Sequence, residues 1–402
     1  MKVLFAAPYI YDPGHPEFMK NATGFGYMVK DILDGVSQNN KVFLLTHQFS
    51  SGYKNGYIVL KHCKLDIVKS INFKDAIKGI KRFFSIKACF GDRLRYVYYS
   101  IDKGYIKHSI SRIKPDIVHI HGLTLQTEPF IEVCRELEIP FIVTLHGLNG
   151  LNNTTVANNI DREYEKKELT RLSRENRCVS VVSSGIKDRI INEYNIPGNN
   201  IKVVLNGTIF GDDRAPQKHD CFNILCIGNI SRRKNQLQIV RAYNLLPREY
   251  KDKVFVTFCG GNSENINLVE EIENIKAKEH LKYVGYVKRE KIIELWNSSD
   301  LNIVASEDEG FGLSMIEGFA YGIPTLTFAD LDAVKDLYNS EAMITVNERK
   351  DIMLAKGIIA AFEREWDSEQ IIQWAKNFSM NKIVQDYESL YCIVAKKESV
   401  KK

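Results

Sequence analysis

The sequence predicts an α/β protein built from two Rossmann-like, doubly wound domains, each with a largely parallel sheet. Three observations lead to this prediction. The chain has 402 residues, which is enough for two domains. Short apolar runs alternate with longer mixed stretches, and this alternation breaks once, near the middle of the chain. The runs are rich in Val, Ile, Leu and Phe without strict polar alternation, which is typical of strands covered on both faces.

The first predicted domain spans residues 1–210. Its expected strands are Lys2–Ala7, Lys41–Thr46, Tyr57–Lys61, Asp116–His121, Phe141–His146, Ser180–Ser184 and Lys202–Leu205. Helices are expected between them at Tyr27–Gln38, Pro129–Leu137 and Asp161–Asn176. Strands that alternate with helices in this way are typical of parallel βαβ units.

A polar stretch that contains a proline, Phe210–Asp220, predicts a linker. The alternation then restarts in a second predicted domain, residues 218–375. Its expected strands are Phe222–Ile227, Val254–Cys259, Lys282–Val287, Leu301–Ala305, Pro324–Phe328 and Met343–Val346. Its expected helices are Asn235–Leu246, Asn267–Lys278, Arg289–Asn297 and Ser314–Tyr321. An amphipathic tail that ends in lysines follows, from residue 378.

The bulk composition is that of an ordinary globular protein. The net charge of +5 is too small to call for a nucleic-acid partner, and none is expected. None of the eight cysteines forms a Cys-x-x-Cys pair, so we expect free thiols in a reducing compartment. The apolar start, Val3–Ile10, is too short for a signal sequence, and no run approaches the roughly 18 apolar residues of a membrane span. These features predict a cytoplasmic protein.

The turns that follow strands are the places to look for chemistry. In doubly wound sheets ligands bind beyond the carboxyl ends of the strands, and two such domains leave a cleft between them. The densest turn of this kind lies within residues 306–324. Gly310 and Gly312 flank Phe311 there and allow the backbone to approach a ligand closely.

Two glutamates flank the start of the helix that follows this turn. The helix is expected to begin near Leu313 or Ser314, where its free N–H groups favour an anion such as a phosphate. Glu309 would repel a phosphate and is better suited to accepting hydrogen bonds from hydroxyl groups. Glu317 lies within the helix, where a carboxylate can accept from a ribose diol. Taken alone, the two residues are equally consistent with solvated surface acids.

The whole string is more specific than its two acids. Gly-Phe-Gly follows the first glutamate, and Gly-x-Pro follows the second. This string resembles the Glu-x7-Glu signature of the retaining GT-B glycosyltransferases of the glycosyltransferase 4 type. The resemblance implies that the segment binds a nucleotide-sugar.

A basic turn after the first strand of the second domain points to a diphosphate. Arg232, Arg233 and Lys234 follow Gly228 and precede a helix, which is the chemistry of an anion site; a solvated basic loop is the alternative. The Lys-Asn pair that starts at Lys234 is similar to the family pattern. Asn229 departs from it, because the family commonly has Arg there. Either Arg232 or Arg233 can supply the missing charge, or Lys234 can act alone.

A third turn is similar to the family turn that contacts the nucleobase. It contains Tyr286 and Val287, whose backbone groups would read the edge of the base. Tyr286 is equally consistent with a packed core aromatic, and the sequence leaves both interpretations open.

The first domain carries weaker versions of the same signals. Gly24 and Gly26 resemble the family's first glycine loop, which closes on donor and acceptor. By resemblance, His146 is the active-site histidine beside the sugar and His121 lines the acceptor side. His119 lies in the middle of a predicted strand and is expected to be a core histidine. No carboxylate or cysteine accompanies these histidines, so no metal site is expected.

Residues 72–114 are basic and aromatic. They hold eleven cations and only three acids, with interleaved Phe and Tyr residues. This composition suits the anionic inner face of a membrane or a lipid-diphosphate carrier. RNA binding would use similar residues. Solvated helices with ordinary apolar faces are the plainer alternative, which charge reversal at Lys78, Lys81 and Arg82 would test.

The resemblance covers nearly the whole chain and implies a GT-B fold. The first domain would bind an acceptor, such as a glycan or a lipid-linked intermediate of surface polysaccharide or glycolipid synthesis, and the second the nucleotide-sugar. The helix of about residues 378–402 would pack back on the first domain. Glu309, His146 and Lys234 would be the catalytic residues, and the reaction would need neither metal nor cofactor.

Two rivals remain open. One is a nucleotide-sugar epimerase of the same fold, which would convert the donor without an acceptor. The other is a non-catalytic scaffold that binds nucleotide-sugar, for which Asn229 is the strongest argument. A Rossmann oxidoreductase is disfavoured, because no Gly-x-Gly-x-x-Gly follows the first strand of either domain.

Overall fold

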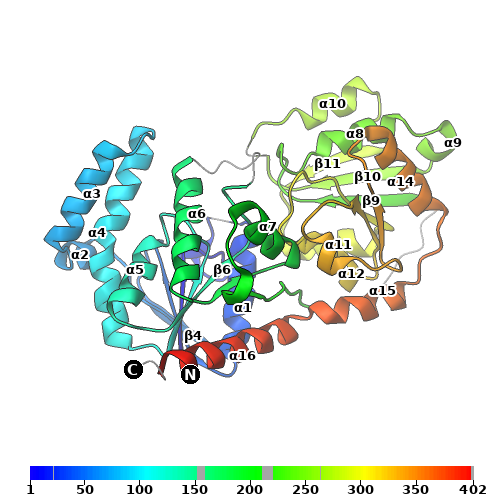
Figure 1. Cartoon of the computed structure of the whole chain (residues 1–402). Helices are drawn as coiled ribbons and strands as arrows, with labels where there is room; N and C mark the ends of the chain where they lie inside the picture. The colour runs from blue at the N-terminus through cyan, green and yellow to red at the C-terminus, as the bar shows by residue number, and fades with distance from the viewer. Residues whose placement is uncertain (21, 152–158, 211–220, 263, 400–402) are drawn as a thin grey trace. The chain divides into compact units, whose positions relative to one another are not determined.

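The computed structural model describes residues 1–402 apart from 21, 152–158, 211–220, 263 and 400–402 (Figure 1). The chain forms two compact units. Unit 1 comprises Met1–Val182, Ile186–Asn206 and Met380–Lys402, and unit 2 comprises Ser183–Gly185 and Gly207–Ser379. Each unit holds one largely parallel sheet with helices, which confirms the predicted fold class. The linker predicted within residues 210–220 lies almost entirely outside the described residues.

The sheet of unit 1 has the strand order β3-β4-β2-β1-β5-β6-β7-β8. Its strands are β1 (Lys2–Ala7), β2 (Lys41–Thr46), β3 (Tyr53–Asn55), β4 (Tyr57–Val59), β5 (Ile117–His121), β6 (Phe141–Leu145), β7 (Val179–Val181) and β8 (Ile201–Val203). Every predicted strand is present, with ends shifted by a few residues. The unpredicted β3 pairs antiparallel with β4 at the edge, and all other neighbours are parallel.

Helix α16 (Met380–Ser399) is an integral part of unit 1 although it comes last in the chain. It packs on α1 (Gly24–Ser37) and contacts β5 and β6. A methyl group at Gly35 of α1 would lie 2.3 Å from the Val384 side chain of α16, so this crossing is close enough to need a glycine. This part of the chain also contains α5 (Glu128–Glu136), α6 (Asn159–Arg174), α7 (Ser184–Tyr194) and the 3-10 turns η1 (Pro16–Phe18) and η2 (Gly198–Asn200).

Three helices lie between β4 and β5, in the stretch that includes the basic residues 72–114. They are α2 (Lys64–Lys69), α3 (Phe73–Ser85) and α4 (Phe90–Ile113). Helix α4 packs on α5, while α2 and α3 pack on α4. Figure 1 shows α2 and α3 at the edge of the unit, outside α4. Gly79 makes the α3–α4 contact possible, because a Cβ there would lie 3.1 Å from the Ser100 Cβ.

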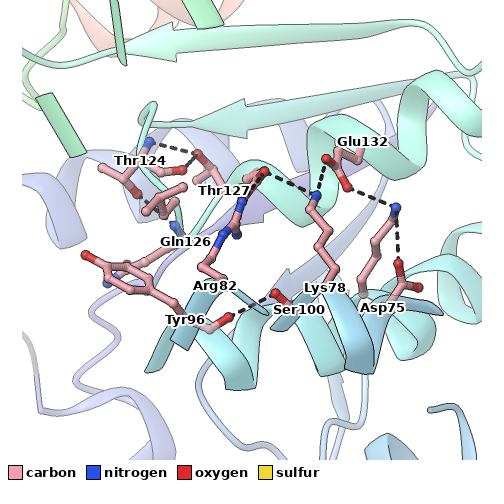
Figure 2. A network of polar contacts seen from close by, with 12 residues as sticks. Asp75, Lys78, Arg82, Tyr96, Ser100, Thr124, Gln126, Thr127 and Glu132 are labelled. Carbon is pink, nitrogen blue, oxygen red and sulfur yellow. Dashed lines mark hydrogen bonds and ion pairs between the residues drawn. The ribbon is translucent and has the colours of Figure 1, made fainter. Parts of the chain in front are cut away.

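Ion pairs join α3 and α4 to α5 (Figure 2). Arg82 donates to both carboxylate oxygens of Glu128 at 2.6 and 2.8 Å, and Lys78 donates to Glu132 at 2.6 Å. Lys103 donates to Glu132 at 2.9 Å and lies 3.6 Å from Asp75. Several cations of the basic stretch are therefore neutralised inside unit 1, including Lys78 and Arg82.

A buried carboxylate ties α4 to the loops beyond β2 and β4. The two oxygens of Asp102 lie 2.8 Å from His47 Nδ1 and 2.9 Å from His62 Nε2. Burial raises the pKa of Asp102, but the hydrogen bonds from His47 and His62 lower it by more, so that pKa lies below its usual value. Burial lowers the pKa of His62, but Asp102 raises it by more.

Unit 2 has a six-stranded parallel sheet of order β11-β10-β9-β12-β13-β14. Its strands are β9 (Phe222–Ile227), β10 (Val254–Cys259), β11 (Leu281–Gly285), β12 (Leu301–Val304), β13 (Thr325–Phe328) and β14 (Met343–Val346). Its helices are α8 (Gln236–Asn244), α9 (Arg248–Lys251), α10 (Leu268–Asn274), α11 (Arg289–Asn297), α12 (Leu313–Ala320), α13 (Val334–Leu337), α14 (Asp351–Glu363), α15 (Ser368–Ala375) and the turn η3 (Lys376–Phe378).

The strand order of unit 2 reverses at β9. The chain leaves β9 for β10 and β11 on one side, then returns to β12 on the other. The carboxyl ends of β9 and β12 therefore lie at a topological switch point, where parallel α/β sheets bind their ligands. The two turns singled out in the sequence, after residues 227 and 304, both leave the sheet there.

Replacing Asp102 with Asn removes the charge that both histidines contact, and we expect a loss of about 3 kcal/mol in the free energy of unfolding. Protonated His62 contributes to the free energy of unfolding through its contact with Asp102. This contribution is complete below the unfolded pKa of His62, about 6.5, and is lost as pH rises through its higher folded pKa. The contribution from ionised Asp102 is present above its unfolded pKa of about 3.9 and is lost in acid.

Urea unfolding should therefore show a larger effect of Asp102→Asn near pH 6 than near pH 8. Asp252→Asn serves as the control, because this exposed carboxylate makes only a 4.0 Å pair with Arg248; its effect should stay below about 0.5 kcal/mol. An Asp102→Asn effect of equal size at both pH values would contradict the assigned contacts.

Candidate functional site

Hydrogen bonds join the two turns at the switch point of unit 2. The Glu307 N–H donates to the Arg233 carbonyl at 2.7 Å. The Asn235 side-chain amide donates to the Glu307 carboxylate at 2.8 Å. Residues about seventy positions apart in the sequence thus form one polar surface at the end of the sheet.

An ion pair between Lys234 and Glu309 forms the centre of this surface. Lys234 Nζ donates to the Glu309 carboxylate at 2.6 Å, and Ser306 Oγ donates to the same oxygen at 3.2 Å. Arg233 Nη1 lies 3.5 Å from that oxygen and donates to the Asp308 carbonyl at 2.9 Å. The Lys234 and Glu309 side chains are only 16% and 12% exposed, so water screens the pair weakly.

The cluster keeps Glu309 ionised. Burial raises the pKa of Glu309, but Lys234 and Arg233 lower it by more, so that pKa lies below its usual value. Two cations face one carboxylate, which leaves positive charge to meet an anion. Glu309 itself remains a hydrogen-bond acceptor at neutral pH.

Glycines shape the backbone around the ion pair. Gly312 has φ +80°, and a Cβ there would lie 2.9 Å from the Met315 sulfur, so the position is restricted to glycine. Helix α12 begins directly after it, and the N–H groups of its first turn add to the positive potential of the site. Gly260 has φ +151°, and a Cβ there would lie 2.1 Å from the Gly228 carbonyl oxygen.

Among the other residues of the segment 306–324, Phe311 and Ser314 are packed in the interior and Glu317 is partly exposed. Phe311 is buried and packs against Phe378, with ring centroids 6.2 Å apart. It therefore anchors the turn and presents no side chain to a ligand. Ser314 is also buried, and its carbonyl accepts a hydrogen bond from Asn302. Glu317 lies half-buried in α12, one turn beyond Leu313.

Asn229 braces the basic turn. Its side-chain oxygen accepts a hydrogen bond from the Gly261 N–H at 3.3 Å, and its carbonyl accepts one from Gln236 at 3.2 Å. Arg232 is exposed, while Arg233 lies beside the buried ion pair. Of the two arginines that the sequence left open, the geometry favours Arg233 as the source of the extra charge.

Tyr286 is 52% exposed, so the interpretation of this residue as a core aromatic is wrong. It follows Gly285, whose φ of +71° turns the chain at the end of β11. Val287 is partly buried against the cluster that contains Leu225 and Trp296. Tyr286 is thus free to contact a ligand, while Val287 holds the turn to the core.

Arg349 supports the Glu309 loop, and the sequence analysis missed it. Its guanidinium donates to both oxygens of Asp330 at 2.8 Å and to the Ser306 carbonyl at 2.8 Å. It also stacks on the Phe328 ring at 4.6 Å. No local pattern marks this arginine, because it follows β14 and meets the loop only through the sheet. Ser306, which donates to Glu309, was also missed, although it lies only three residues away in the same loop, because a lone serine carries no distinctive pattern.

The histidines of unit 1 lie at the carboxyl ends of β5 and β6. His121 Nδ1 and His146 Nε2 are 3.1 Å apart. His119 lies in the core, where it bonds to Tyr391 at 2.7 Å and to Thr144 at 2.6 Å. Burial lowers the pKa of His146 to about 4 and holds the pKa of His119 and of His121 well below the usual range. All three rings are neutral at pH 7.

The hydrogen bond between His121 and His146 indicates a tautomer. His121 Nε2 is buried and has no hydrogen-bond partner in the structure. Unpaired buried N–H groups are rarer than unpaired acceptors, so His121 carries its proton on Nδ1 and donates it to His146 Nε2. His146 then carries its own proton on Nδ1 and offers a neutral N–H donor.

The glycine loop of unit 1 lies beside His146. Thr23 caps α1 by accepting a hydrogen bond from the Gly26 N–H at 3.2 Å, which fixes the first turn after Gly24. The Phe25 ring meets the His146 ring edge-on, with centroids 5.1 Å apart. The structure therefore gathers Gly24, Gly26, His121 and His146 at one edge of this sheet. Among the described residues, no group of three or more His, Cys, Asp or Glu side chains is arranged to hold a metal ion.

Comparison with known proteins identifies both halves. The family model "Glycosyltransferase Family 4" matches residues 44–209, and the model "Glycosyl transferases group 1" matches residues 212–378. A glycogen synthase of Mycobacterium tuberculosis is 23% identical over 53% of this chain and 52% of its own length. An O-antigen chain mannosyltransferase B of Escherichia coli is 23% identical over 51% of this chain and 61% of its own.

The matches to these curated relatives span only between half and two thirds of the relatives' length. A glycosyltransferase structure from Rickettsia africae covers 98% of both chains with a TM-score of 0.70 at 18% identity, which shows the same fold.

The assigned tautomer can be tested by ¹⁵N NMR of histidine-labelled protein. We expect His146 to show the neutral Nδ1–H form from pH 8 down to its pKa of about 4. His121→Phe removes the donor to Nε2, so His146 should then populate the Nε2–H form as well. The exposed His108 provides a reference ring. A His146 ring that is protonated at pH 6, or in the Nε2–H form in the unmodified protein, would contradict the assignment.

Proposed function

We propose that this chain, which belongs to the GT-B glycosyltransferases of group 1 and family 4, moves a sugar from a nucleotide-diphosphate donor to an acceptor hydroxyl. In the proposed transfer the anomeric configuration of the sugar is retained. The single observation that carries the proposal is the buried pair of Lys234 and Glu309, with Arg233 beside it, at the start of α12. This arrangement offers an anion site and a hydroxyl acceptor within one cluster.

In the proposed donor complex the diphosphate lies against Lys234, Arg233 and the first turn of α12. These groups supply two charges and the positive end of a helix dipole. Glu309 accepts hydrogen bonds from the sugar hydroxyls, and Glu317 accepts them from the ribose. The turn at Tyr286 contacts the base, which the exposure of this ring permits.

The proposed chemistry is an attack on the same face from which the diphosphate leaves. The bond between the anomeric carbon and the phosphate oxygen breaks, and the acceptor oxygen forms the new bond. The acceptor proton passes to the departing phosphate oxygen. Lys234, Arg233 and the α12 N-terminus stabilise the negative charge that grows on the diphosphate, so they act more strongly in the transition state than in the ground state.

His146 is proposed to position the sugar. A neutral ring with its proton on Nδ1 can donate one hydrogen bond to a hydroxyl or ring oxygen without adding charge. Gly24 and Gly26, which allow close backbone approach, and His121, which orients the ring, are proposed to line the acceptor side. The scheme uses neither a metal ion nor a cofactor.

The proposed acceptor is a glycan or a lipid-linked intermediate in the synthesis of surface polysaccharide or glycolipid. The curated relatives support this class, since a glycogen synthase and an O-antigen mannosyltransferase both extend glycans, as their names state. We further propose that the protein works in the cytoplasm at the inner face of a membrane. No helix among the described residues has the length and apolar character needed to cross a bilayer.

A non-catalytic scaffold is the rival that one observation favours. Asn229 replaces a cation of the family pattern and holds the Gly261 backbone instead. Arg233 offsets this loss, because it reaches the same cluster from four residues further on. A thermal-shift screen of nucleotide-sugars, followed by assays of the stabilising donors with and without acceptors, separates transfer from epimerisation and from binding alone.

Glu309→Gln tests the central residue. We expect kcat for transfer to fall by about 10²-fold or more, because the variant keeps the shape but loses the charged acceptor beside Lys234. Steady-state kinetics on the identified donor measures this loss. Glu369→Gln is the matched control, since this exposed carboxylate belongs to α15 and not to the cluster around Lys234, and its kcat should stay within about threefold. Wild-type turnover in Glu309→Gln would refute the site.

The assignment of the phosphate charges predicts an order among three variants. Lys234→Met should weaken the binding of a nucleoside diphosphate by about tenfold or more, and Arg233→Met should weaken it less. Arg232→Met should stay within about twofold, because this side chain is exposed and away from the ion pair. Isothermal titration gives the three dissociation constants. If Arg232→Met had the largest effect, the phosphate would lie elsewhere on the turn.

A further inference from the structure

Nine exposed apolar side chains cluster on α2, α3 and the start of α4. They are nine of the nineteen large hydrophobic side chains that the structure describes as exposed, although they come from a short part of the chain. Phe73 and Phe84 are 77% and 78% exposed. We call this surface the apolar face, and its members are Leu65, Val68, Ile71, Phe73, Ile77, Ile80, Phe84, Phe90 and Leu94.

Helix α3 carries the apolar face because its amphipathic pattern is inverted. Its exposed apolar residues, Phe73, Ile77, Ile80 and Phe84, recur every three or four positions and so lie on one side of the helix. Lys78 and Arg82 turn the other way, toward α5, as their ion pairs show (Figure 2), while Lys74 and Lys81 are exposed. A helix at a water-facing surface normally has the opposite arrangement.

The apolar face is bordered by positive charge. Residues 61–95 are all described, and they hold seven exposed cations against three acids, each of which is partly buried and lies within 4 Å of a cation. Asp66 lies 3.7 Å from Lys61, and Asp92 lies 3.4 Å from Arg95. Asp75 turns inward to Lys103 at 3.6 Å. The exposed cations of the same stretch are Lys61, Lys64, Lys69, Lys74, Lys81, Lys87 and Arg95. Apolar side chains bordered by an excess of exposed cations match the chemistry of an anionic bilayer surface.

We propose that the apolar face of α2–α4 inserts into the surface of a lipid bilayer that carries anionic headgroups. Phe73, Ile77, Ile80 and Phe84 enter the acyl region, and lysines such as Lys74 and Lys81 meet the headgroups. The proposal goes beyond glycosyl transfer, because it uses no residue of the donor site. It also narrows the membrane alternative left open by the sequence to the apolar face, since Lys78 and Arg82 are held by Glu128 and Glu132.

The charge pattern favours a bilayer over a second copy of the chain. An isologous dimer through this face would place seven exposed cations opposite the same seven, and the partly exposed acids Asp66 and Asp92 lie within 4 Å of only Lys61 and Arg95 among them. A nucleic acid would meet aliphatic side chains such as Leu65, Val68 and Ile80, which bind neither bases nor phosphates.

The first test uses Phe73→Gln/Phe84→Gln in the full chain. Both side chains are almost fully exposed, so the double substitution should leave the fold intact. We expect the unmodified chain to sediment with vesicles of phosphatidylcholine and phosphatidylglycerol, and the variant to bind at least about tenfold more weakly. Leu245→Gln/Val269→Gln is the matched control, because these exposed apolar residues lie in unit 2; its binding should not change.

The second test concerns charge. Lys74→Gln/Lys81→Gln should weaken binding to the mixed vesicles and reduce its dependence on salt. Lys356→Gln/Lys382→Gln removes the same charge from exposed positions elsewhere and should change binding little. A Trp introduced by Phe84→Trp should be quenched by brominated lipid, whereas Leu245→Trp should not.

Three results would overturn the proposal. The first is an unmodified chain that stays in the supernatant with the mixed vesicles. The second is Phe73→Gln/Phe84→Gln protein that binds as well as the unmodified chain. The third is gel filtration that shows a dimer for the unmodified chain and a monomer for this variant. That result would identify a second copy of the chain as the partner of the apolar face. Donor binding and turnover on a water-soluble acceptor should be unchanged in Phe73→Gln/Phe84→Gln protein. Conversely, Glu309→Gln protein should still bind vesicles. The membrane proposal and the glycosyl-transfer proposal can therefore fail independently.

Discussion

The weakly screened ion pair between Lys234 and Glu309 is the interaction on which the donor unit depends. It exists because the carboxyl ends of β9 and β12 are neighbours at the switch point, and because the Glu307 N–H bonds the second turn to the first. A carboxylate this well buried stays charged only beside cations, and Arg233 completes that condition. The same surplus of positive charge is what the proposed diphosphate site would use.

The two units differ in the charge of their buried polar groups. Unit 2 keeps charges in a place with little water, and it needs Arg349, fixed by Asp330 and Phe328, to hold the loop that presents them. Unit 1 keeps three histidines uncharged by burying them among Thr144, Tyr391 and one another. A neutral donor at His146 would orient a sugar without competing for the diphosphate, so this division of charge suits group transfer from an anionic donor.

Helix α3 shows why composition alone does not define a binding surface. The basic and aromatic composition of residues 72–114 suggested a membrane surface as one alternative, yet Lys78 and Arg82 are used internally to attach the helical insertion to α5. What remains outside is apolar, with lysines around it. The hydrophobic effect would then carry most of the membrane affinity, and charge would select the lipid composition.

The sequence by itself determined the α/β class, the strands of both sheets and the string around Glu309, because buried strands, glycine turns and helix starts are local chemistry that short patterns record. Only the tertiary structure decided which partners meet across the chain. Arg349 donates to the Ser306 carbonyl in the loop that carries Glu309. Asp102 contacts both His47 and His62, and Arg82 pairs with Glu128. Each of these contacts joins residues that are far apart in the sequence and come together only when the strands and inserted helices pack. Local sequence patterns do not record which of these residues become neighbours.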